Sequence, residues 1–202
     1  MIRKQFFVFL TLVLFSIFLQ SQERPLLAPG QPLSGPVDLS SPDGRLKISF
    51  AVLAGESNGK TENELVHSVS FRGKPLVNAS PIKLDLQGQP PLGPNMTIAG
   101  SDPSAHDDGY TLISGKASKV RDHYNGVYIR LEDSAVPSHN DSAEVFLAKR
   151  KFEIEARAYD DAVAFRYVIP EQAALREFRM AQEETEFRFA KDPTAYAQEL
   201  PD

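Results

Sequence analysis

Near the end of the chain, two stretches of alternating apolar and polar residues flank a pair of aspartates, in FEIEARAYDDAVAFRYVIP at residues 152–170. A period of two places alternate side chains on opposite faces of a β-strand. Asp160 and Asp161 supply turn chemistry, and Pro170 ends the second stretch because proline cannot donate to an inner ladder. The pattern predicts a β-hairpin with one solvent-facing side, the unit of an antiparallel sheet. The expected core face consists of Phe152, Ile154, Ala156, Ala158, Val163, Phe165, Tyr167 and Ile169.

The same alternation recurs earlier in the chain, between turn signals such as Ser41-Pro42-Asp43-Gly44. It predicts further strands within residues 46–52, 69–71, 76–77, 82–86 and 127–131. Residues 87–108 are rich in Gly, Pro, Asn and Asp, and that composition indicates a long irregular loop.

The stretch after Pro170 gives two conflicting signals. Residues 171–182 contain many strong helix formers, so propensity alone favours a helix. Phe178 and Met180 alternate with charged residues, however, and so do Phe187 and Phe189, which favours strands for both pairs. We expect strands. Several short strands, turn-rich connections and few helical patterns together predict an all-β fold, an antiparallel β-sandwich.

The N-terminus has the pattern of an export signal. Arg3 and Lys4 precede a run of about 14 mostly apolar residues, which is short for a membrane span and typical of a secretory signal. We interpret residues 1–22 as a signal peptide, with an uncleaved anchor as the alternative. We expect an exported protein, periplasmic or extracellular in a bacterium, without membrane contact after cleavage. Residues 23–40, rich in Pro, Gly and Ser, are interpreted as a linker, and residues 41–202 as the folded domain.

Charge and cysteine content narrow the functional classes. The formal net charge is −5, and removal of Arg3 and Lys4 with the signal leaves 20 basic against 27 acidic side chains, or −7. No cluster of Lys and Arg stands out, which argues against a nucleic-acid partner. The chain has no cysteine, so an exported form would depend on a buried apolar core without disulfides.

Two polar stretches invite a functional interpretation, and each also has a plainer one. The first stretch consists of Arg121, Asp122, His123, Tyr124 and Asn125. Its His, Tyr and Asn side chains could together form a sugar-binding edge. Alternatively, the stretch could be a turn whose side chains cap the next strand. A group of three glutamates could supply a catalytic or metal-binding carboxylate, or form a solvated face. Within a strand, Glu184 and Glu186 would share a face and Glu183 would oppose them.

Two smaller features likewise have both a functional and a purely structural interpretation. His106, Asp107 and Asp108 could contact a cation, but one cluster in a loop lacks the remaining ligands, and the plainer interpretation is a solvated loop. Arg166 could bind a carboxylate or a sugar hydroxyl; more plainly, it could pair with an acid such as Glu155 across the hairpin or lie along the sheet surface. No phosphate loop, nucleophile elbow or paired-His zinc motif occurs. A glycosidase needs two carboxyl groups about 5 to 10 Å apart, and the sequence singles out no such pair. We therefore assign no catalytic, cofactor-binding or metal-binding residue.

Several stretches, taken in order, resemble one known family, the N-terminal domain of glycoside hydrolase family 97. They are SPDGRLKISF, RGKPLVNASPIKLDL, VRDHYNGVYIRL, FEIEARAYDDAVAFRYVIP, EETEFRF and TAYAQELP. The similarity runs from about Ser40 to the last residue. It implies a β-sandwich of the galactose-mutarotase-like, or supersandwich, type, which in the family precedes a catalytic (β/α)8 barrel. The family consists of exported bacterial α-glucosidases and α-galactosidases that need calcium.

The resemblance also sets an expectation for function. The family's catalytic residues lie on the barrel, and this chain stops at Asp202, before the barrel and, we expect, before the sandwich is complete. It implies a non-catalytic domain that supports the barrel and the sugar pocket of a calcium-dependent α-glycosidase. The implied partners are that barrel and, through it, an α-linked oligosaccharide. No cofactor is expected for this chain alone. The alternatives are a free-standing carbohydrate-binding module and a periplasmic interaction protein.

Two details of the family pattern are not matched clearly by this chain: a glutamate that binds calcium and the sequence of the hairpin turn. Glu199 falls near the place where the family's N-terminal domain lends a glutamate to calcium, but the residue cannot be aligned there and is not assigned. Where the family tends to have Asp-Gly at the hairpin turn, this chain has Asp161-Ala162. Alanine resists positive φ, so either the turn differs or Asp161 adopts the left-handed conformation.

Overall fold

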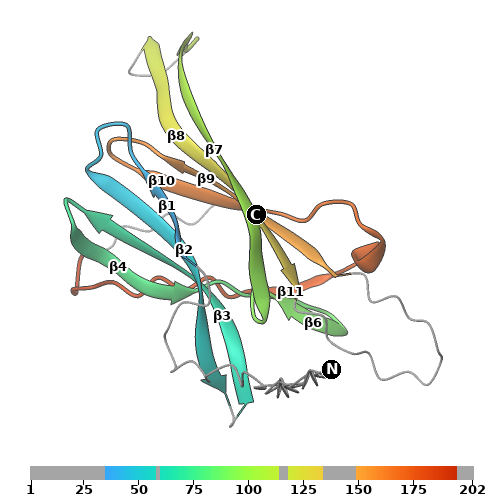
Figure 1. Ribbon diagram of the computed structural model, residues 1–202. Helices are drawn as coiled ribbons and strands as arrows, with labels where there is room; N and C mark the ends of the chain where they lie inside the picture. The colour runs from blue at the N-terminus through green and yellow to red at the C-terminus, as the bar shows by residue number, and fades with distance from the viewer. Residues whose placement is uncertain (1–34, 58–59, 114–117, 134–148, 195–202) are drawn as a thin grey trace, which may run out of the picture.

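Antiparallel strands make up most of the described chain (Figure 1). The computed structural model describes residues 35–57, 60–113, 118–133 and 149–194. Three sheets are present among these residues. The first sheet has the order β1-β2-β3-β4, the second β10-β9-β8-β7, and the third β11-β5-β6. The strands are β1 Val37–Ser40, β2 Leu46–Ser57, β3 Lys60–Phe71, β4 Lys74–Pro81, β5 Leu84–Leu86, β6 Gln89–Leu92, β7 Met96–Thr111, β8 Lys119–Asp133, β9 Lys151–Ala158, β10 Val163–Val168 and β11 Met180–Glu183.

The predicted hairpin is confirmed as β9 and β10, which pair from Val163↔Ala158 to Val168↔Glu153. The four predicted core residues of β9 are fully buried, at 0% exposure. Those of β10 pack against the core but stay half-buried. The turn between the strands differs from a two-residue Asp-Gly turn. The Tyr159 N–H donates to the Ala162 carbonyl at 2.8 Å, and Asp161 does not adopt positive φ.

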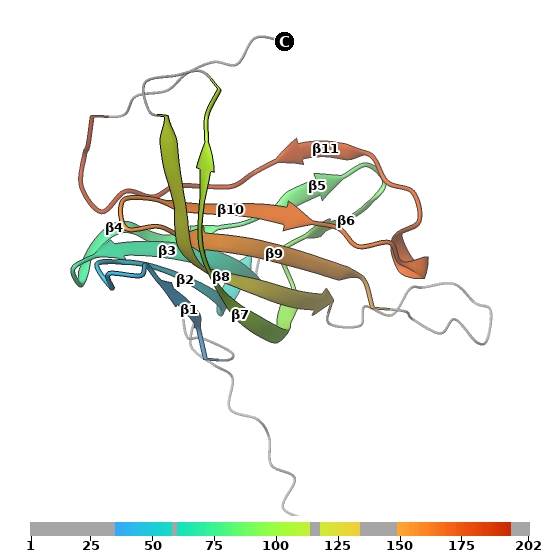
Figure 2. The same cartoon turned by 90° about the horizontal axis from the view of Figure 1, so that it is seen from above.

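The core lies between the first and second sheets, which form the two layers seen in Figure 2. The rings of Phe50 on β2 and Phe165 on β10 meet edge to face, with centroids 5.7 Å apart. Alternate residues on β2, β8 and β9 fill the space between the sheets because their strands have the period of two. The all-β, sandwich-type prediction is thus confirmed, and the fully buried large side chains include Phe50, Phe152, Ile48, Leu65, Ile129, Leu131 and Ile154.

The prediction of an irregular loop at residues 87–108 is wrong. That stretch contains β6 and most of β7, and β7 pairs with β8 from Met96↔Asp133 to Thr111↔Lys119. β7 is an edge strand of the second sheet, where Pro103 can be accommodated. A register shift between Ile98 and Gly100 absorbs one residue. Pairing with the long β8 therefore outweighs the weak strand propensity of Gly, Pro and Asp.

Two other boundaries need correction. Residues 37–40, placed in the predicted linker, form β1, which pairs with β2 and buries Leu39. After Pro170, a short 3-10 helix at Ala173–Leu175 replaces the longer helix that propensity favours. The first of the two expected strands is present as β11, while the second is reduced to the isolated bridge Val77↔Phe189. The predicted signal peptide and Glu199 lie outside the described residues.

Residues 184–190, called here the closing segment, run antiparallel along β4 at the edge of the first sheet. The N–H groups of Glu184 and Glu186 donate to the carbonyls of Lys83 and Pro81 at 2.8 and 3.0 Å. Further along, the Asn78 N–H donates to the Arg188 carbonyl at 2.8 Å, the Ala190 N–H donates to the Leu76 carbonyl at 2.9 Å, and the Arg188 N–H donates to the Ser80 hydroxyl at 2.9 Å. The segment thereby acts as a further edge of the first sheet.

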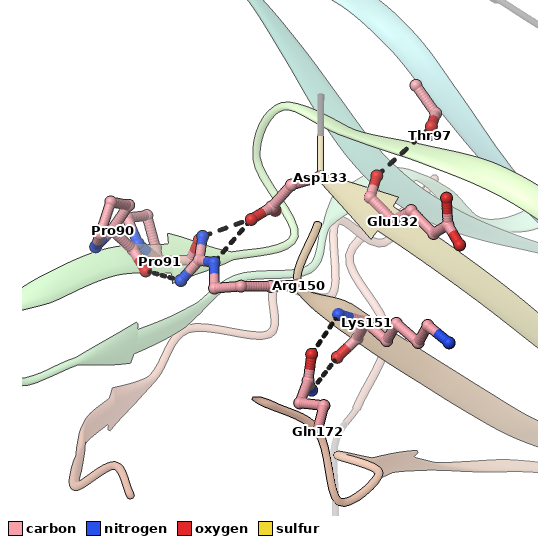
Figure 3. A network of polar contacts seen from close by, with 8 residues as sticks. All are labelled: Pro90, Pro91, Thr97, Glu132, Asp133, Arg150, Lys151 and Gln172. Carbon is pink, nitrogen blue, oxygen red and sulfur yellow. Dashed lines mark hydrogen bonds and ion pairs between the residues drawn. The ribbon is translucent and has the colours of Figure 1, made fainter. Parts of the chain in front are cut away.

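A largely buried ion pair joins the second and third sheets (Figure 3). Arg150 Nε lies 2.6 Å from Asp133 Oδ2, and the two side chains are only 12% and 13% exposed. The same guanidinium donates to the carbonyls of Pro90 at 2.6 Å and Pro91 at 3.2 Å, on β6. Proline lacks an N–H but keeps its carbonyl, so Arg150 can satisfy two acceptors of a strand that pairs poorly.

Candidate functional site

The outer face of the second sheet carries the largest gathering of polar and aromatic side chains that the sequence singled out. On β8, Val127, Ile129 and Leu131 point into the core, so the even-numbered residues point outward. The register then aligns His106 with Tyr124, and Tyr128 with Glu155. The stretch Arg121–Asn125 lies inside β8, so its interpretation as a turn before a strand is wrong.

Tyr124 is the centre of a stacked row across three strands. Its ring stacks on His106 of β7, with centroids 5.1 Å apart and planes 30° apart. The Arg157 guanidinium carbon, on β9, lies 4.5 Å from the Tyr124 ring centroid, and the ring of Tyr159, just after β9, lies 5.2 Å away. His106 and Arg157 approach from strands on opposite sides of β8. The faces of Tyr124, the candidate sugar platform, are therefore already occupied by protein groups.

Because β7 and β8 pair, the structure brings together two polar stretches that are separate in the sequence, residues 106–108 and residues 121–125. His106 Nε2 lies 3.5 Å from Asp122 Oδ2. Arg121 donates twice to the Asp107 carboxylate, each at 2.7 Å, and this pairing lowers the pKa of Asp107. These contacts are cross-strand pairs on an exposed hairpin, and each contributes only modestly to stability.

The other members of the stretch serve the fold. Asn125 Nδ2 donates to the Ser40 carbonyl at 2.9 Å and so ties β8 to β1. His123 is half-buried and aligns with Asp107 in the register. Sequence reasoning missed Tyr159 and Arg157, which complete the row. The β8–β9 register would have placed them beside Tyr124.

Arg166 pairs with Glu155 across the hairpin, as the sequence predicted in its plainer interpretation. Arg166 Nε donates to Glu155 Oε2 at 2.8 Å, and Arg157 donates to the other oxygen at 3.0 Å. These two bonds, with Arg166 first, lower the pKa of the Glu155 carboxyl. A carboxylate held in its charged form by two arginines is poorly suited to be a general acid near neutral pH.

A small hollow opens beside this row, where β8 carries Gly126. It has a volume of about 140 Å³. A Cβ at Gly126 would lie 2.5 Å from the Ser104 hydroxyl, so the glycine leaves the space open. The hollow is lined by Ser104, Tyr124, Gly126, Val127, Tyr128, Glu155, Ala156 and Arg157.

The glutamates at the end of β11 and just after it make ion pairs and hydrogen bonds with neighbouring side chains. Lys83 Nζ lies 2.7 Å from Glu184 Oε2, and Arg188 Nε lies 2.7 Å from Glu186 Oε2. Glu183 accepts from the Thr185 hydroxyl at 3.0 Å. Of the residues whose positions are described, no three His, Asp or Glu side chains gather so as to hold a metal ion. No helix in that part of the chain is long and apolar enough to cross a membrane.

Comparison with known proteins gives a consistent result. The family model described as glycosyl-hydrolase 97 N-terminal matches residues 39–202. A retaining alpha-galactosidase of Bacteroides thetaiotaomicron is 26% identical over 157 residues, which cover 78% of this chain and 19% of that protein.

Solved structures agree with the fold. Glycoside hydrolase family 97 enzymes from Pseudoalteromonas sp. strain K8, in complex with panose or with acarbose, match with a TM-score of 0.62 and 22% identity. A beta-arabinopyranosidase matches with a TM-score of 0.59 and 26% identity. The matches cover 76% of this chain but only 20–21% of those chains. The chain therefore belongs to the glycosyl-hydrolase 97 N-terminal family and spans about a fifth of the length of the relatives it matches.

Proposed function

We propose that this chain is the non-catalytic N-terminal domain of an exported α-glycosidase, and that it supports a catalytic module of the same polypeptide. The observation that carries the proposal is the family match over residues 39–202, in a chain that spans 19% of a retaining alpha-galactosidase. The described residues agree with a supporting role. Their acidic side chains are spread over sheet surfaces in ion pairs such as Arg166–Glu155 and Lys83–Glu184.

The substrate of the longer polypeptide would be an α-linked oligosaccharide, by analogy with relatives named for galactosidase activity or solved with panose and acarbose. The calcium that the family resemblance implies would belong to the longer polypeptide; among the described residues no three His, Asp or Glu side chains gather so as to hold a metal ion, and we assign none of them to calcium. Export to the periplasm or outside the cell rests on the N-terminal pattern of Arg3 and Lys4 before an apolar run.

The proposal is tested by assaying the purified chain on p-nitrophenyl α-glucoside and α-galactoside, with and without calcium. We expect no turnover above a buffer control. A supporting domain lacks the two facing carboxyl groups that glycoside hydrolysis needs. Turnover that scales with protein concentration, and that survives a further purification step, would refute the non-catalytic assignment.

The alternative of a free-standing carbohydrate-binding module has one structural feature in its favour, the hollow at Gly126 between Tyr124 and Tyr128. The occupied faces of Tyr124 argue against it, because sugars bind aromatic rings face-on. We expect the amide resonances of Tyr124 and Gly126 to stay unchanged in millimolar maltose or melibiose. A saturable shift at both positions would favour the binding module instead.

A further inference from the structure

His67 is a fully buried titratable side chain on β3, and the proposed function gives it no role. Its Nε2 donates to the Glu186 carbonyl at 2.8 Å, and this carbonyl belongs to the closing segment. Its Nδ1 is buried and has no hydrogen-bond partner within the described part of the chain. The neutral ring therefore uses its one N–H on the closing segment. A second proton would have to bind Nδ1, where no acceptor is available for the new N–H.

The side chains around the ring are apolar or uncharged. The rings of Phe165 on β10 and Phe187 in the closing segment each have a centroid 5.1 Å from that of His67. In the strand register, His67 lies opposite Phe50 on β2 and Ser80 on β4. A charged imidazolium would be desolvated here without a counter-charge, so the closed site favours the neutral ring.

The titratable groups of the elements that pack against the ring do not relieve this. In the closing segment, Glu184 pairs with Lys83, and Glu186 pairs with Arg188 at the surface. On the inner face of β10, burial raises the pKa of Tyr167 to about 12, so this phenol stays neutral. The imidazole thus has no carboxylate beside Nδ1 to stabilise an added proton.

Among the elements that cover the ring, the closing segment is held least firmly. β2 and β3 pair residue by residue along their whole lengths. The backbone bonds of the closing segment, within the described residues, run only to residues 76–83, with the one isolated bridge Val77↔Phe189. Phe187 and Phe189 are already 54% and 52% exposed, so little apolar burial is lost when the segment detaches. Segments with few buried contacts open locally at a lower free-energy cost than the rest of a domain.

We propose that His67 is an acid-sensitive latch: when its ring takes up a second proton, the closing segment detaches from β4 while the two sheets stay folded. Detachment breaks the Nε2 bond to the Glu186 carbonyl and removes the Phe187 ring, so water can reach the imidazolium. Hydration of the charged ring then offsets part of the cost of opening. The inference does not depend on the proposed function, because the ring and its cover both belong to the described residues.

The direction of the pH effect follows from linkage. Burial lowers the pKa of His67 in the closed form, whereas in the open form the ring is hydrated and has a pKa near the ordinary value of about 6.5. The closed form is therefore favoured in full above about pH 6.5 and loses its advantage as the pH falls towards the lower, closed-form pKa. Between pH 7.5 and 5.0, the population of the open form should rise at least about tenfold.

Hydrogen exchange of the purified chain at pH 7.5 and 5.0 provides the first test. The amides of Glu184, Glu186 and Ala190 donate to carbonyls within residues 76–83, and their protection factors should fall at least about tenfold at the lower pH. Their exchange should depend weakly on urea, because a local opening exposes little surface, whereas exchange in β9 should depend on it strongly. The Ser41 amide, bonded in the turn between β1 and β2, is the control and should keep its protection factor.

The latch is overturned by either of two results. The closing-segment amides could keep their protection factors at pH 5.0. They could also share the urea dependence of β9, which would mean that they exchange only when the whole sandwich unfolds.

Variants provide the second test, at the ring and at its cover. His67→Phe keeps an aromatic ring without a titratable nitrogen, so the closing segment should have the same protection factors at both pH values. Phe187→Ser uncovers the imidazole, and the midpoint of the His67 titration, followed by its ring proton resonances, should rise towards about 6.5. Phe178→Ser, at a ring 40% exposed outside the closing segment, should leave that midpoint unchanged.

Two results with these variants would contradict the proposal. One is a His67 midpoint that is the same in Phe187→Ser, Phe178→Ser and the parent chain. The other is a closing segment that still loses protection at pH 5.0 in His67→Phe, because a different group would then control its opening.

Discussion

His67 is the one ionisable side chain that is fully buried among the described residues. Its Nε2 lies 2.8 Å from the Glu186 carbonyl, so Nε2 carries the proton and donates. Its Nδ1 has no hydrogen-bond partner. Around the ring lie Phe165, Phe187 and, as neighbours in the register, Phe50 and Ser80. Burial lowers the pKa of His67, because a charged imidazolium here would be desolvated with one N–H unsatisfied.

This geometry predicts a loss of stability on mild acidification. The pKa of His67 is lower in the folded than in the unfolded chain, so the unfolded chain binds the extra proton first. The stabilisation is complete above the unfolded pKa of about 6.5 and is lost as the pH falls towards the folded pKa, at most about 1.4 kcal/mol per pH unit. Urea unfolding of the native chain between pH 7 and 5 should show this slope.

His67→Phe should flatten the slope, whereas His106→Gln, a change at a partly exposed ring of the hairpin, should retain it. A slope that persists in His67→Phe would show that other groups titrate in this window.

Gly93 adopts a φ of +106° between β6 and β7, where a Cβ would overlap the carbonyl oxygen of Ile82. Gly93→Ala should therefore destabilise the fold by about 3 kcal/mol, from backbone strain and the clash together. Gly73, in the β3–β4 turn, has a φ of +75° but no atom within 4 Å of the Cβ position. Gly73→Ala should cost only about 1 kcal/mol. Chemical denaturation of both variants measures the two losses in the free energy of unfolding. Equal losses would mean that the backbone around Gly93 shifts to accommodate the added methyl group.

At the scale of elements, the sequence predicted what a local pattern can encode. The alternation in β9 and β10 identified the buried face residue by residue, because one side of each strand must meet the core. It failed for β7, whose strand state comes from pairing with β8 rather than from its own residues. The site shows the same limit. His106, Tyr124 and Arg157 are far apart in sequence, and only the strand register places them in one row.

The ion pair that joins β8 and β9 to β6 should be costly to break, in contrast to those on the surface. Arg150→Ala would leave Asp133 and the Pro90 and Pro91 carbonyls without their donor in a nearly buried position. We expect a loss of about 3 kcal/mol in the free energy of unfolding. Arg188→Ala removes an exposed pair with Glu186 and should cost under about 1 kcal/mol. Similar losses for the two variants would show that water replaces Arg150.

At the scale of the whole molecule, most of the exposed large apolar side chains of the described residues come from two stretches of the chain. Phe178, Met180, Phe187 and Phe189 belong to the stretch after β10, Tyr110, Leu112 and Ile113 lie at and just after the end of β7, and Leu76 of β4 is exposed as well. Where such side chains form a patch on an otherwise polar surface, the patch is typically a contact region. This distribution agrees with a domain that supports other parts of a protein.

The outer half of the β7–β8 hairpin should be dispensable for folding of the sandwich. The described residues of β7 beyond His106 are exposed, and the hairpin projects past the neighbouring strands in Figure 1. Replacing residues 109–121 by Asn-Gly would join Asp108 and Asp122, which already pair, through a two-residue turn that favours hairpins. We expect the free energy of unfolding to change by less than about 1 kcal/mol, because only surface pairs such as Arg121–Asp107 are lost.

Urea denaturation of the shortened chain measures this change, with Phe152→Ala in β9 as the contrasting variant. That substitution empties a fully buried position and should cost about 3 to 5 kcal/mol. The two results together separate the cooperative sandwich from the projecting hairpin. A shortened chain destabilised as much as Phe152→Ala would mean that the hairpin helps to hold the sheets together. Its exposed Tyr110, Leu112 and Ile113 would then no longer indicate a surface for contact with other parts of a longer protein.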